Sequence, residues 1–310
     1  MKKYRVGILG ATGTVGQRFA QLLEDHPQFE ITAMAASDRS AGKVYSEACA
    51  WKLPGKIPAN VRDIVVTPIE PPLDCDIVFS SLPGSVARET EEAFARAGYA
   101  VISNSSVYRM DEDVPLLIPE INADHVGLIE KQRENRGFAK GFIVTNPNCA
   151  VVSFAPPLAA LHRKFGVESV IVTTLQAISG AGYPGVAALD ITDNVFPYIA
   201  GEEPKVETEA QKILGVFTES GIQKADFTVS AQCFRVNVVD GHMASVRVNL
   251  KKTAALDEVI DAMKTFPSLD LHSSPARFID VTDEPSRPQT RLDRDNGNGM
   301  TITVGRVFPD

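Results

Sequence analysis

One cysteine stands where its thiol could act as a nucleophile. Cys149 ends the segment Asn146-Pro-Asn-Cys149 and opens an apolar run with a helical pattern. A thiol in the first turn of a helix faces the positive end of the helix dipole, which stabilises the thiolate. Asn148 and neighbouring backbone N–H groups could then hold the oxyanion that forms when a thiolate attacks a carbonyl carbon. The alternative is an inert thiol, with Asn148 serving only as the helix cap.

His242 is the best candidate among the five histidines for exchanging a proton with that thiol. It lies in the segment Val-Val-Asp240-Gly-His242, between two runs of strand composition and seven residues after Arg235. A turn at this place would let both side chains face one cleft, where an acid or a base is needed. An ordinary histidine in a turn is the alternative.

A glycine loop near the N-terminus has the sequence context of a dinucleotide site. The segment Gly10-Ala-Thr-Gly13-Thr-Val-Gly16 follows an apolar run and precedes an amphipathic stretch. Glycines let backbone N–H groups approach a pyrophosphate, and the following helix directs its positive end at it. The spacing is GxxGxxG and not GxGxxG, and a tight turn without a ligand is the alternative.

The end of the second strand candidate bears on the choice between NADP and NAD. The sequence there reads Ser37-Asp38-Arg39-Ser40. Arg39 and the two hydroxyls suit a ribose 2′-phosphate, which favours NADP. Asp38 keeps NAD open, because an acidic residue at this place binds the free ribose hydroxyls.

The composition is that of an ordinary globular protein. Of the 310 residues 44% are hydrophobic, and the net charge of -8 argues against a general affinity for nucleic acid or an anionic membrane. No apolar run reaches the roughly 20 residues of a membrane helix, and the N-terminus leads directly into a strand-like segment, so we expect a cytoplasmic protein. The four cysteines form no CxxC pair and no cluster with histidine, so we expect neither a disulfide nor a metal site.

The elements that would position these residues indicate two domains. Residues 1–148 alternate strand candidates with helical stretches, which predicts an α/β domain with a Rossmann-type, doubly wound parallel sheet. Residues 149–310 contain longer strand runs and predict an α+β domain. The strand candidates are 4–9, 30–36, 64–67, 76–80, 99–103, 169–176, 227–236 and 244–250; the helical stretches are 17–24, 86–97, 202–215 and 256–266; and 283–299 is expected to be a loop.

Several segments together resemble the aspartate-β-semialdehyde dehydrogenase family. The glycine loop, the Asn-Pro-Asn-Cys149 segment, Gln176 before Ser179-Gly-Ala-Gly, and Arg235 with His242 occur in the order and spacing of that family. The resemblance spans essentially the whole chain. The segments most similar to the archaeal and fungal branch of the family are 103–110, 202–209 and 287–294.

The resemblance implies an enzyme that reduces an activated acyl group. Such an NADPH-dependent oxidoreductase converts β-aspartyl phosphate into aspartate semialdehyde and phosphate, for lysine, threonine and methionine biosynthesis. Cys149 would attack the acyl phosphate and retain a thioester. His242 would take the thiol proton and return one when the thiohemiacetal collapses, and Gln176 would orient the substrate.

The resemblance also assigns a partner to each charge of aspartyl phosphate. Arg235 would bind the α-carboxylate, Glu202 the ammonium, and Arg109 and Lys205 the phosphate. Glu202 and Lys205 lie three residues apart and would share a helix face, although a solvated ion pair is the alternative. The predicted substrate site comprises Arg109, Asn148, Glu202, Lys205 and Arg235, and the predicted cofactor site comprises Gly10, Thr12, Gly13, Thr14, Val15, Ser37, Arg39, Ser40, Ser81, Ser179 and Gly180.

Two other functions stay open at this point. A malonyl-CoA reductase would use the same scaffold on another acyl donor, whereas Glu202 argues against N-acetylglutamyl phosphate, which has no ammonium group. A non-catalytic nucleotide-sensing protein would keep the fold without a reactive thiol. The family assembles through its second domain, so we expect a homodimer or homotetramer that binds a small-molecule substrate. Family members usually continue past the strand at 300–307 into a helix that returns to the first domain; if the chain stops at Asp310, we expect a weaker affinity for the cofactor.

Overall fold

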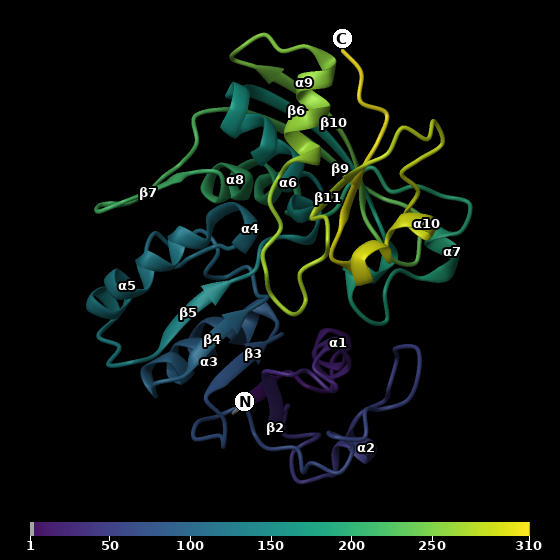
Figure 1. Ribbon diagram of the computed structural model, residues 1–310. Coiled ribbons are helices and arrows are strands. Elements are labelled where there is room, and N and C mark those ends of the chain that lie inside the picture. Colours follow the sequence, from purple (N-terminus) through teal and green to yellow (C-terminus); the bar gives the residue numbers. More distant parts are fainter. Residues whose placement is uncertain (1–2, 310) are drawn as a thin grey trace. The chain divides into compact units, whose positions relative to one another are not determined.

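The computed structural model describes residues 3–309 and consists of two compact units (Figure 1). The first unit runs to Leu117 and includes Asp124–Asn146. The second unit takes in Ile118–Ala123 and continues from Pro147. The domain boundary that we propose from the sequence, after residue 148, lies close to the point where the chain passes into the second unit for the last time, between Asn146 and Pro147. Among residues 3–309, no helix combines the length and the apolar character that crossing a bilayer requires.

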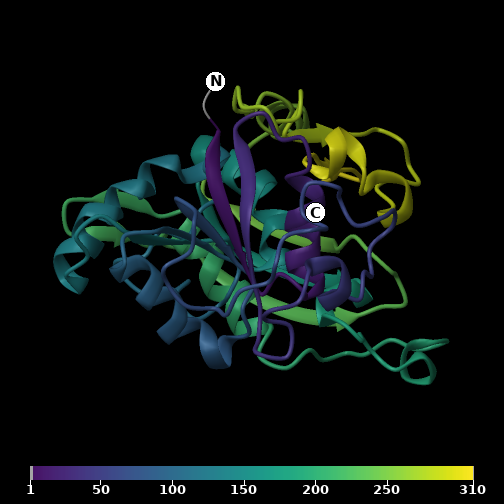
Figure 2. The ribbon, with the colours of Figure 1, turned by 90° about the horizontal axis from the view of Figure 1, so that it is seen from below.

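The first unit is built on a five-stranded parallel sheet in the order β2-β1-β3-β4-β5. Strands β1 and β2 run side by side in Figure 2. The strand order reverses between β1 and β3, and open α/β sheets bind ligands outside the carboxyl ends of the strands at such a switch point. The strands are β1 (Tyr4–Leu9), β2 (Phe29–Ala35), β3 (Ile77–Ser80), β4 (Ala100–Ser103) and β5 (Phe142–Thr145).

Both faces of this sheet are covered, because β1 sends alternate side chains into two cores. Val6 and Ile8 pack in one core with Tyr45, and Leu9 packs in the other with Phe94 of α3. The predicted Rossmann-type, doubly wound sheet is therefore confirmed. The helices of the first unit are α1 (Thr14–Leu22), α2 (Tyr45–Ala48), α3 (Gly84–Arg96) and α5 (Leu128–Arg136), and the 3-10 turn η1 (Ala123–Gly127) lies at a crossing between the units.

The second unit contains a mixed sheet in the order β10-β6-β9. Strand β6 (Val167–Gln176) is antiparallel to β10 (Met243–Leu250) and parallel to β9 (Thr228–Arg235). The register of the parallel pair places Gln176 beside Arg235. Two side chains singled out in the sequence therefore end neighbouring strands. This unit also holds the pairs β7 (Val216–Thr218) with β8 (Gly221–Gln223) and β11 (Ile279–Val281) with β12 (Ile302–Val304).

Helix α6 (Cys149–Phe165) packs against β10, α8 and α9 of the second unit. Its sequence determines both ends: Asn148 caps the first turn, and Gly166, with a φ of 70°, follows the last. Basic residues 162–164 lie in the last turn, at the negative end of the dipole. The other helical segments of this unit are α4 (Pro119–Asn122), η2 (Ile178–Ala181), α7 (Ala188–Ile191), α8 (Glu203–Ile213), α9 (Leu256–Lys264), α10 (Thr290–Asp293) and η3 (Asn296–Gly299).

Two expectations about secondary structure were wrong. The strand predicted at 64–67 is absent, and Val65 and Thr67 form only isolated bridges to Val44 and Ala35. The loop predicted at 283–299 contains the short segments α10 and η3. Strand β5 and helix α5 are not evident from the sequence, because β5 has only four residues and α5 is largely polar.

Candidate active site

Cys149 begins α6, and its side chain is exposed. The preceding residue, Asn148, caps the helix: its Oδ1 accepts the backbone N–H of Ala150 at 2.8 Å and of Val151 at 3.3 Å. The cap fixes the turn that carries Cys149 and satisfies two N–H groups that a helix start leaves unpaired. The helix start predicted from the sequence is confirmed, and it sets the thiol at the positive end of the dipole.

Two carboxylates hold Asn148 in place, one from Glu202, the residue before α8, and one from Glu209 within that helix. The backbone N–H of Asn148 donates to Glu209 Oε2 at 2.6 Å, and its side-chain Nδ2 donates to Glu202 Oε1 at 2.8 Å. Glu202 and Glu209 are seven residues apart, so two helical turns bring them to one face. Asn148 thus serves as a clamped helix cap, and the oxyanion contact expected for its side chain gains no geometric support.

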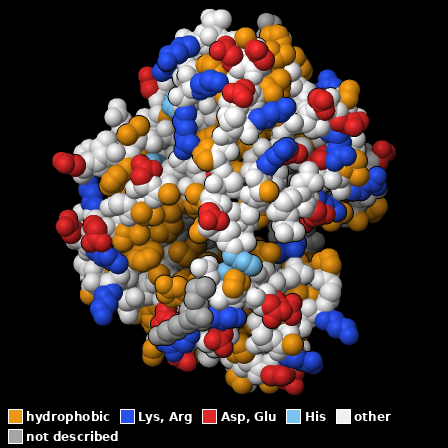
Figure 3. Space-filling model, viewed as in Figure 1, with side chains coloured by type: hydrophobic (Ala, Val, Ile, Leu, Met, Phe, Trp, Pro, Cys, Tyr) orange, Lys and Arg blue, Asp and Glu red, His pale blue; other side chains and the backbone are white. Residues whose placement is uncertain are grey.

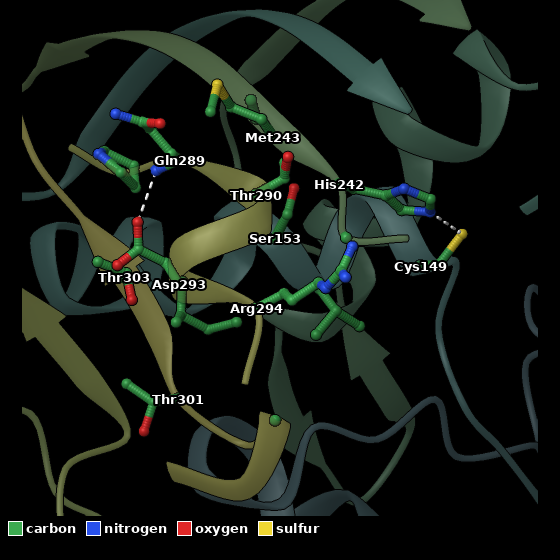
Figure 4. Close-up of a pocket in the computed structure, with 16 residues that line it drawn as sticks. Cys149, Ser153, His242, Met243, Gln289, Thr290, Asp293, Arg294, Thr301 and Thr303 are labelled. Carbon is green, nitrogen blue, oxygen red and sulfur yellow. Dashed lines mark hydrogen bonds between the residues drawn. The ribbon is translucent and has the colours of Figure 1, made fainter. Parts of the chain in front are cut away.

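His242 meets the thiol directly. Its Nε2 lies 3.0 Å from Cys149 Sγ, and Figure 4 shows the ring directed at the sulfur. On the other side of the ring, Nδ1 accepts the backbone N–H of Ala177 at 3.0 Å. Burial, followed by the positive charge of Arg235, holds the pKa of His242 below its usual value, and Glu202 acts in the opposite direction. The imidazole is therefore neutral near pH 7.

Arg235 brings a buried positive charge to the same place. Its side chain is 7% exposed, and Nη1 donates to the carbonyl of Ala177 at 2.7 Å. Gly180 provides the space for this arrangement, because a Cβ there would lie 2.9 Å from Arg235 Nη1 and 3.3 Å from His242 Cε1. Gln176, 1% exposed, is the register partner of Arg235. The guanidinium therefore lies next to the cysteine–histidine pair.

Glu202 adds a buried negative charge. It is 6% exposed, and its Oε2 accepts a hydrogen bond from Lys205 Nζ at 3.0 Å. This contact is the ion pair that the sequence offered as the alternative to substrate binding, and the roles of the two residues toward a substrate stay predictions. Burial alone would raise the pKa of Glu202, but hydrogen bonds from Asn148 and then Lys205 hold that pKa below its usual value. The carboxylate is therefore ionised at neutral pH.

The second unit thus brings together most of the predicted catalytic and substrate-binding residues. Arg109 belongs to the first unit, where its side chain is buried and donates to the carbonyl of Asn104 at 2.9 Å. Ser179 lies in η2, and its hydroxyl donates to Asp240 Oδ1 at 2.9 Å. The predicted residues of the second unit are Asn148, Cys149, Gln176, Ser179, Gly180, Glu202, Lys205, Arg235 and His242.

A cavity of about 230 Å³ opens beside Cys149 and His242 (Figure 4). Its opposite wall comes from residues between 288 and 303. Part of this wall, 287–294, resembles the family in sequence, but the resemblance assigns it no role. Within that wall the guanidinium of Arg294 donates to the carbonyl of Asp240 at 3.1 Å. This hydrogen bond joins the wall to the loop that carries His242. The wall therefore places polar groups opposite the exposed side of Cys149 and His242.

The glycine loop of the first unit has the shape of a phosphate cradle. Gly10 adopts a φ of 80°, and a Cβ on Gly16 would lie 2.4 Å from the carbonyl oxygen of Gly10, so both places require glycine. The buried side chain of Gln17 donates to the carbonyl of Thr12 at 3.0 Å and accepts the backbone N–H of Lys52 at 2.7 Å. The loop is thereby held open at the N-terminus of α1, as a pyrophosphate requires.

The other predicted cofactor residues of the first unit lie after the carboxyl ends of β2 and β3, the strands on either side of β1. Ser81 follows β3, and its hydroxyl donates to the carbonyl of Leu9 at 3.0 Å. Ser37 and Arg39 are exposed in a turn after β2, where the backbone N–H of Ser40 donates to the carbonyl of Ser37 at 2.8 Å. The first unit thus fits a dinucleotide. The exposed Ser37 hydroxyl and Arg39 guanidinium lie just after β2, where a 2′-phosphate would need them.

Two residues of the site, Glu209 and Ala177, are not among those predicted from the sequence. Glu209 could have been found, because it repeats the position of Glu202 two helical turns later. Ala177 acts only through its backbone, which holds both Arg235 and His242. No side-chain pattern signals such a role.

The four thiols should differ sharply in reactivity. Within residues 3–309 none of the four forms a disulfide, and only Cys149 is exposed. Burial raises the pKa of the Cys75 thiol to about 12 and also raises the pKa of Cys49 and Cys233. We expect limiting iodoacetamide at pH 7 to label Cys149 alone, as read by peptide mass spectrometry. Labelling of any buried cysteine at a similar rate would contradict this assignment.

Both halves of the sequence match families of known proteins. Residues 5–129 match the semialdehyde dehydrogenase NAD binding domain, and residues 158–310 match the semialdehyde dehydrogenase dimerisation domain. An aspartate-semialdehyde dehydrogenase of Archaeoglobus fulgidus is 52% identical over 309 residues, which cover 99% of this chain and 90% of the relative.

Solved structures are similar over the same length. The aspartate semialdehyde dehydrogenase of Candida albicans, solved with NADP, superposes with a TM-score of 0.92 at 41% identity and covers 99% of this chain and 90% of its own. Aspartate semialdehyde dehydrogenase II of Vibrio cholerae, complexed with ASA, gives a TM-score of 0.77 at 26% identity over 100% of this chain and 89% of its own.

Proposed function

This chain belongs to the aspartate-semialdehyde dehydrogenase family, and from that premise we propose that it converts β-aspartyl phosphate into aspartate semialdehyde and phosphate with NADPH. The observation that carries the proposal is the 3.0 Å contact between Cys149 Sγ and His242 Nε2. A buried carboxylate and a buried guanidinium accompany this pair in the second unit. That combination suits an acyl substrate that carries both an ammonium and a carboxylate.

The acyl group is transferred to Cys149. The thiolate sulfur donates an electron pair to the acyl carbon, and the tetrahedral intermediate collapses with loss of phosphate to leave a thioester. The helix start stabilises the thiolate before attack, and His242 stays in hydrogen-bonding contact with the sulfur. The thioester keeps the acyl group activated for reduction.

The charged side chains hold the aspartyl part of the substrate. We propose that Arg235 binds the α-carboxylate through its planar guanidinium and that Glu202 binds the ammonium. Gln176 lies beside Arg235 in the register and would orient the substrate next to the thiol. Lys205, and Arg109 of the first unit, would bind the phosphate. Each ionic group of the substrate then has a partner of opposite charge.

NADP is the cofactor that the first unit would hold. Its pyrophosphate would lie on the glycine loop, at Gly10, Thr12, Gly13, Thr14 and Val15, with Ser81 beside the loop. Ser37, Arg39 and Ser40 would bind the 2′-phosphate, while Ser179 and Gly180 would contribute from the second unit. When bound, the cofactor supplies the hydride that reduces the thioester.

Replacing Arg39 by alanine should separate the two nicotinamide cofactors. A charge-assisted bond to the 2′-phosphate would be lost, so the KM for NADPH should rise about ten- to hundredfold. NADH has no such phosphate, and its KM should stay within about twofold of wild type. Steady-state kinetics with both cofactors measures the difference, and an equal rise in both values would refute the assignment of Arg39.

The substrate is tested most directly in the oxidative direction. Purified protein is given aspartate semialdehyde or malonate semialdehyde, each with phosphate or with CoA, and NADPH formation is followed. We expect turnover with aspartate semialdehyde and phosphate. Turnover only with malonate semialdehyde and CoA would replace the proposal by a malonyl-CoA reductase, and no turnover with an unreactive Cys149 would favour a nucleotide sensor.

The assembly and the cellular compartment complete the proposal. The second unit belongs to a dimerisation-domain family, so the protein is a homo-oligomer that acts on a small molecule, and we propose a homodimer or homotetramer. We also propose the cytoplasm as its compartment, because its relatives are biosynthetic enzymes. On the face shown in Figure 3, basic side chains are interspersed with acidic ones.

A further inference from the structure

We propose that Asp111 is a positioning residue that fixes the loop carrying Arg109, the proposed phosphate ligand of the first unit. This loop, residues 104–113, follows β4 and lies wholly within the first unit. The inference rests on the proposed function, because it takes Arg109 to bind the phosphate of the substrate.

Two arginines on different helices hold Asp111. Arg88 of α3 donates to both carboxylate oxygens, from Nη1 at 3.0 Å and from Nη2 at 3.1 Å. Arg136 at the end of α5 donates to Oδ2 at 2.9 Å. Burial alone would raise the pKa of Asp111, but hydrogen bonds from Arg88 and then Arg136 hold that pKa below its usual value. The carboxylate is therefore ionised at neutral pH, and charge-assisted bonds set its position.

Two neighbouring residues of the loop join the same network. Arg136 Nε donates to Asp113 Oδ2 at 2.8 Å, and these two side chains are only 16% and 11% exposed. Tyr108 is fully buried, and its hydroxyl donates to the carbonyl of Arg88 at 2.6 Å. Its ring centre lies 4.4 Å from Cζ of Arg88 and 5.1 Å from Cζ of Arg136. An isolated surface ion pair restrains little, whereas a shielded network with cation–π contacts holds all its members.

Arg109 lies between two of these anchors in the sequence, Tyr108 and Asp111. Its Nη2 donates to the carbonyl of Asn104, the first residue of the loop, at 2.9 Å. The side-chain amide of Asn146 donates in turn to Oδ1 of Asn104. Asn146 begins the segment that leads to the nucleophile. The loop is thus held by the arginine network at one end and joined to the nucleophile segment at the other.

A loop held in this way lowers the cost of ordering Arg109 when phosphate binds. Replacing Asp111 by asparagine would remove the charge and one acceptor oxygen, and the new NH2 group would face a guanidinium that can only donate. The end of the loop should then loosen while Arg136 keeps its bond to Asp113. The aspartyl part of the substrate, which we place in the second unit, should not feel the change.

The kinetic test measures the KM for inorganic phosphate in the oxidative direction, with aspartate semialdehyde and NADP at saturation. We expect D111N to raise this KM about tenfold and to leave the KM for aspartate semialdehyde and for NADP within about twofold of wild type. R109Q, which removes the proposed ligand itself, provides a double-mutant cycle. If Asp111 acts through Arg109, adding D111N to R109Q should change the phosphate KM by less than about twofold.

Hydrogen exchange on ligand-free protein tests the positioning without substrate. Peptides that cover residues 104–113 should exchange about tenfold faster in D111N than in wild type. The matched control is E130Q, which removes an ion pair between Glu130 and Arg133 of α5, at 2.7 Å, that lies outside the network around Asp111. E130Q should leave both the exchange of the loop and the phosphate KM as in wild type.

Two results would overturn the inference: exchange of the loop that D111N leaves unchanged, and a phosphate KM that D111N does not raise or raises equally in wild type and in R109Q. The second result would make Asp111 a residue of the fold alone. Turnover with CoA in place of phosphate would instead refute the proposed function, together with the phosphate-binding role of Arg109. Because the exchange measurement needs no substrate, it distinguishes a loop that Asp111 does not hold from an enzyme that uses another acyl acceptor.

Discussion

Replacing Cys149 by serine is expected to lower kcat by a factor on the order of 10⁴ or more, because a serine hydroxyl at neutral pH is a far weaker nucleophile than a thiolate. A serine side chain is only slightly smaller than a cysteine side chain, and the change leaves the helix cap at Asn148 intact. We therefore expect the free energy of unfolding and the affinity for NADPH to remain close to those of wild type. The oxidation of aspartate semialdehyde measures the rate, and denaturant unfolding measures stability.

The matched control for this variant is Cys49→Ala, which removes a buried thiol of the first unit. Its kcat should stay within about twofold of wild type, because the side chain has no role in the proposed chemistry. A burst of phosphate from β-aspartyl phosphate, one equivalent per active site, should be seen with wild type in the absence of NADPH and be absent in Cys149→Ser. A normal burst in that variant would exclude Cys149 as the acyl acceptor.

Replacing Arg235 by lysine should lower kcat/KM for aspartate semialdehyde about a hundred- to thousandfold. Lysine keeps the charge but loses the planar pair of N–H donors that a carboxylate needs, in a place where the guanidinium is buried. The loss should be larger in KM than in kcat if binding of the carboxylate is the main contribution. Steady-state kinetics in the oxidative direction separates the two constants.

The substrate itself supplies the control for this second variant. An aldehyde of similar length without the α-carboxylate should be a poor substrate for both proteins, and the Arg235→Lys change should then cost less than about fivefold. Arg277→Lys alters an exposed arginine that pairs with Asp280 at 3.2 Å, and it should leave both substrates unaffected. If Arg235→Lys slowed the two aldehydes equally, the role of Arg235 would be structural.

Local chemistry explains which parts of the site could be predicted. The segment before Cys149 contains its own cap, so the helix start and the position of the thiol follow from residues 146–152 alone. The glycine loop likewise follows from its immediate neighbours. Its glycines are needed because of contacts within the loop itself, such as that between Gly16 and the carbonyl of Gly10. Such features can be predicted because the residues that make the contacts are adjacent in the sequence.

Long-range contacts explain what could not be predicted. The pairing of Gln176 with Arg235 depends on the register of β6 and β9, which are parallel and far apart in the sequence. The role of Ala177 depends on the hydrogen bond between its backbone N–H and His242, which lies far along the sequence. The alanine side chain gives no sign of this contact. The false strand at 64–67 has the same origin: Val65 bridges to Val44 and Thr67 to Ala35, and neither single bridge extends into a ladder.

The clamp on Asn148 also ties the reactivity of the thiol to the thermal behaviour of the second unit. Helix ends usually open by local fluctuations that cost little free energy, and hydrogen exchange is fast there. The first turn of α6 cannot open in this way without also breaking the buried contact of Asn148 with Glu209. Warming should therefore inactivate the enzyme when the second unit unfolds as a whole, and not through earlier fraying around the nucleophile.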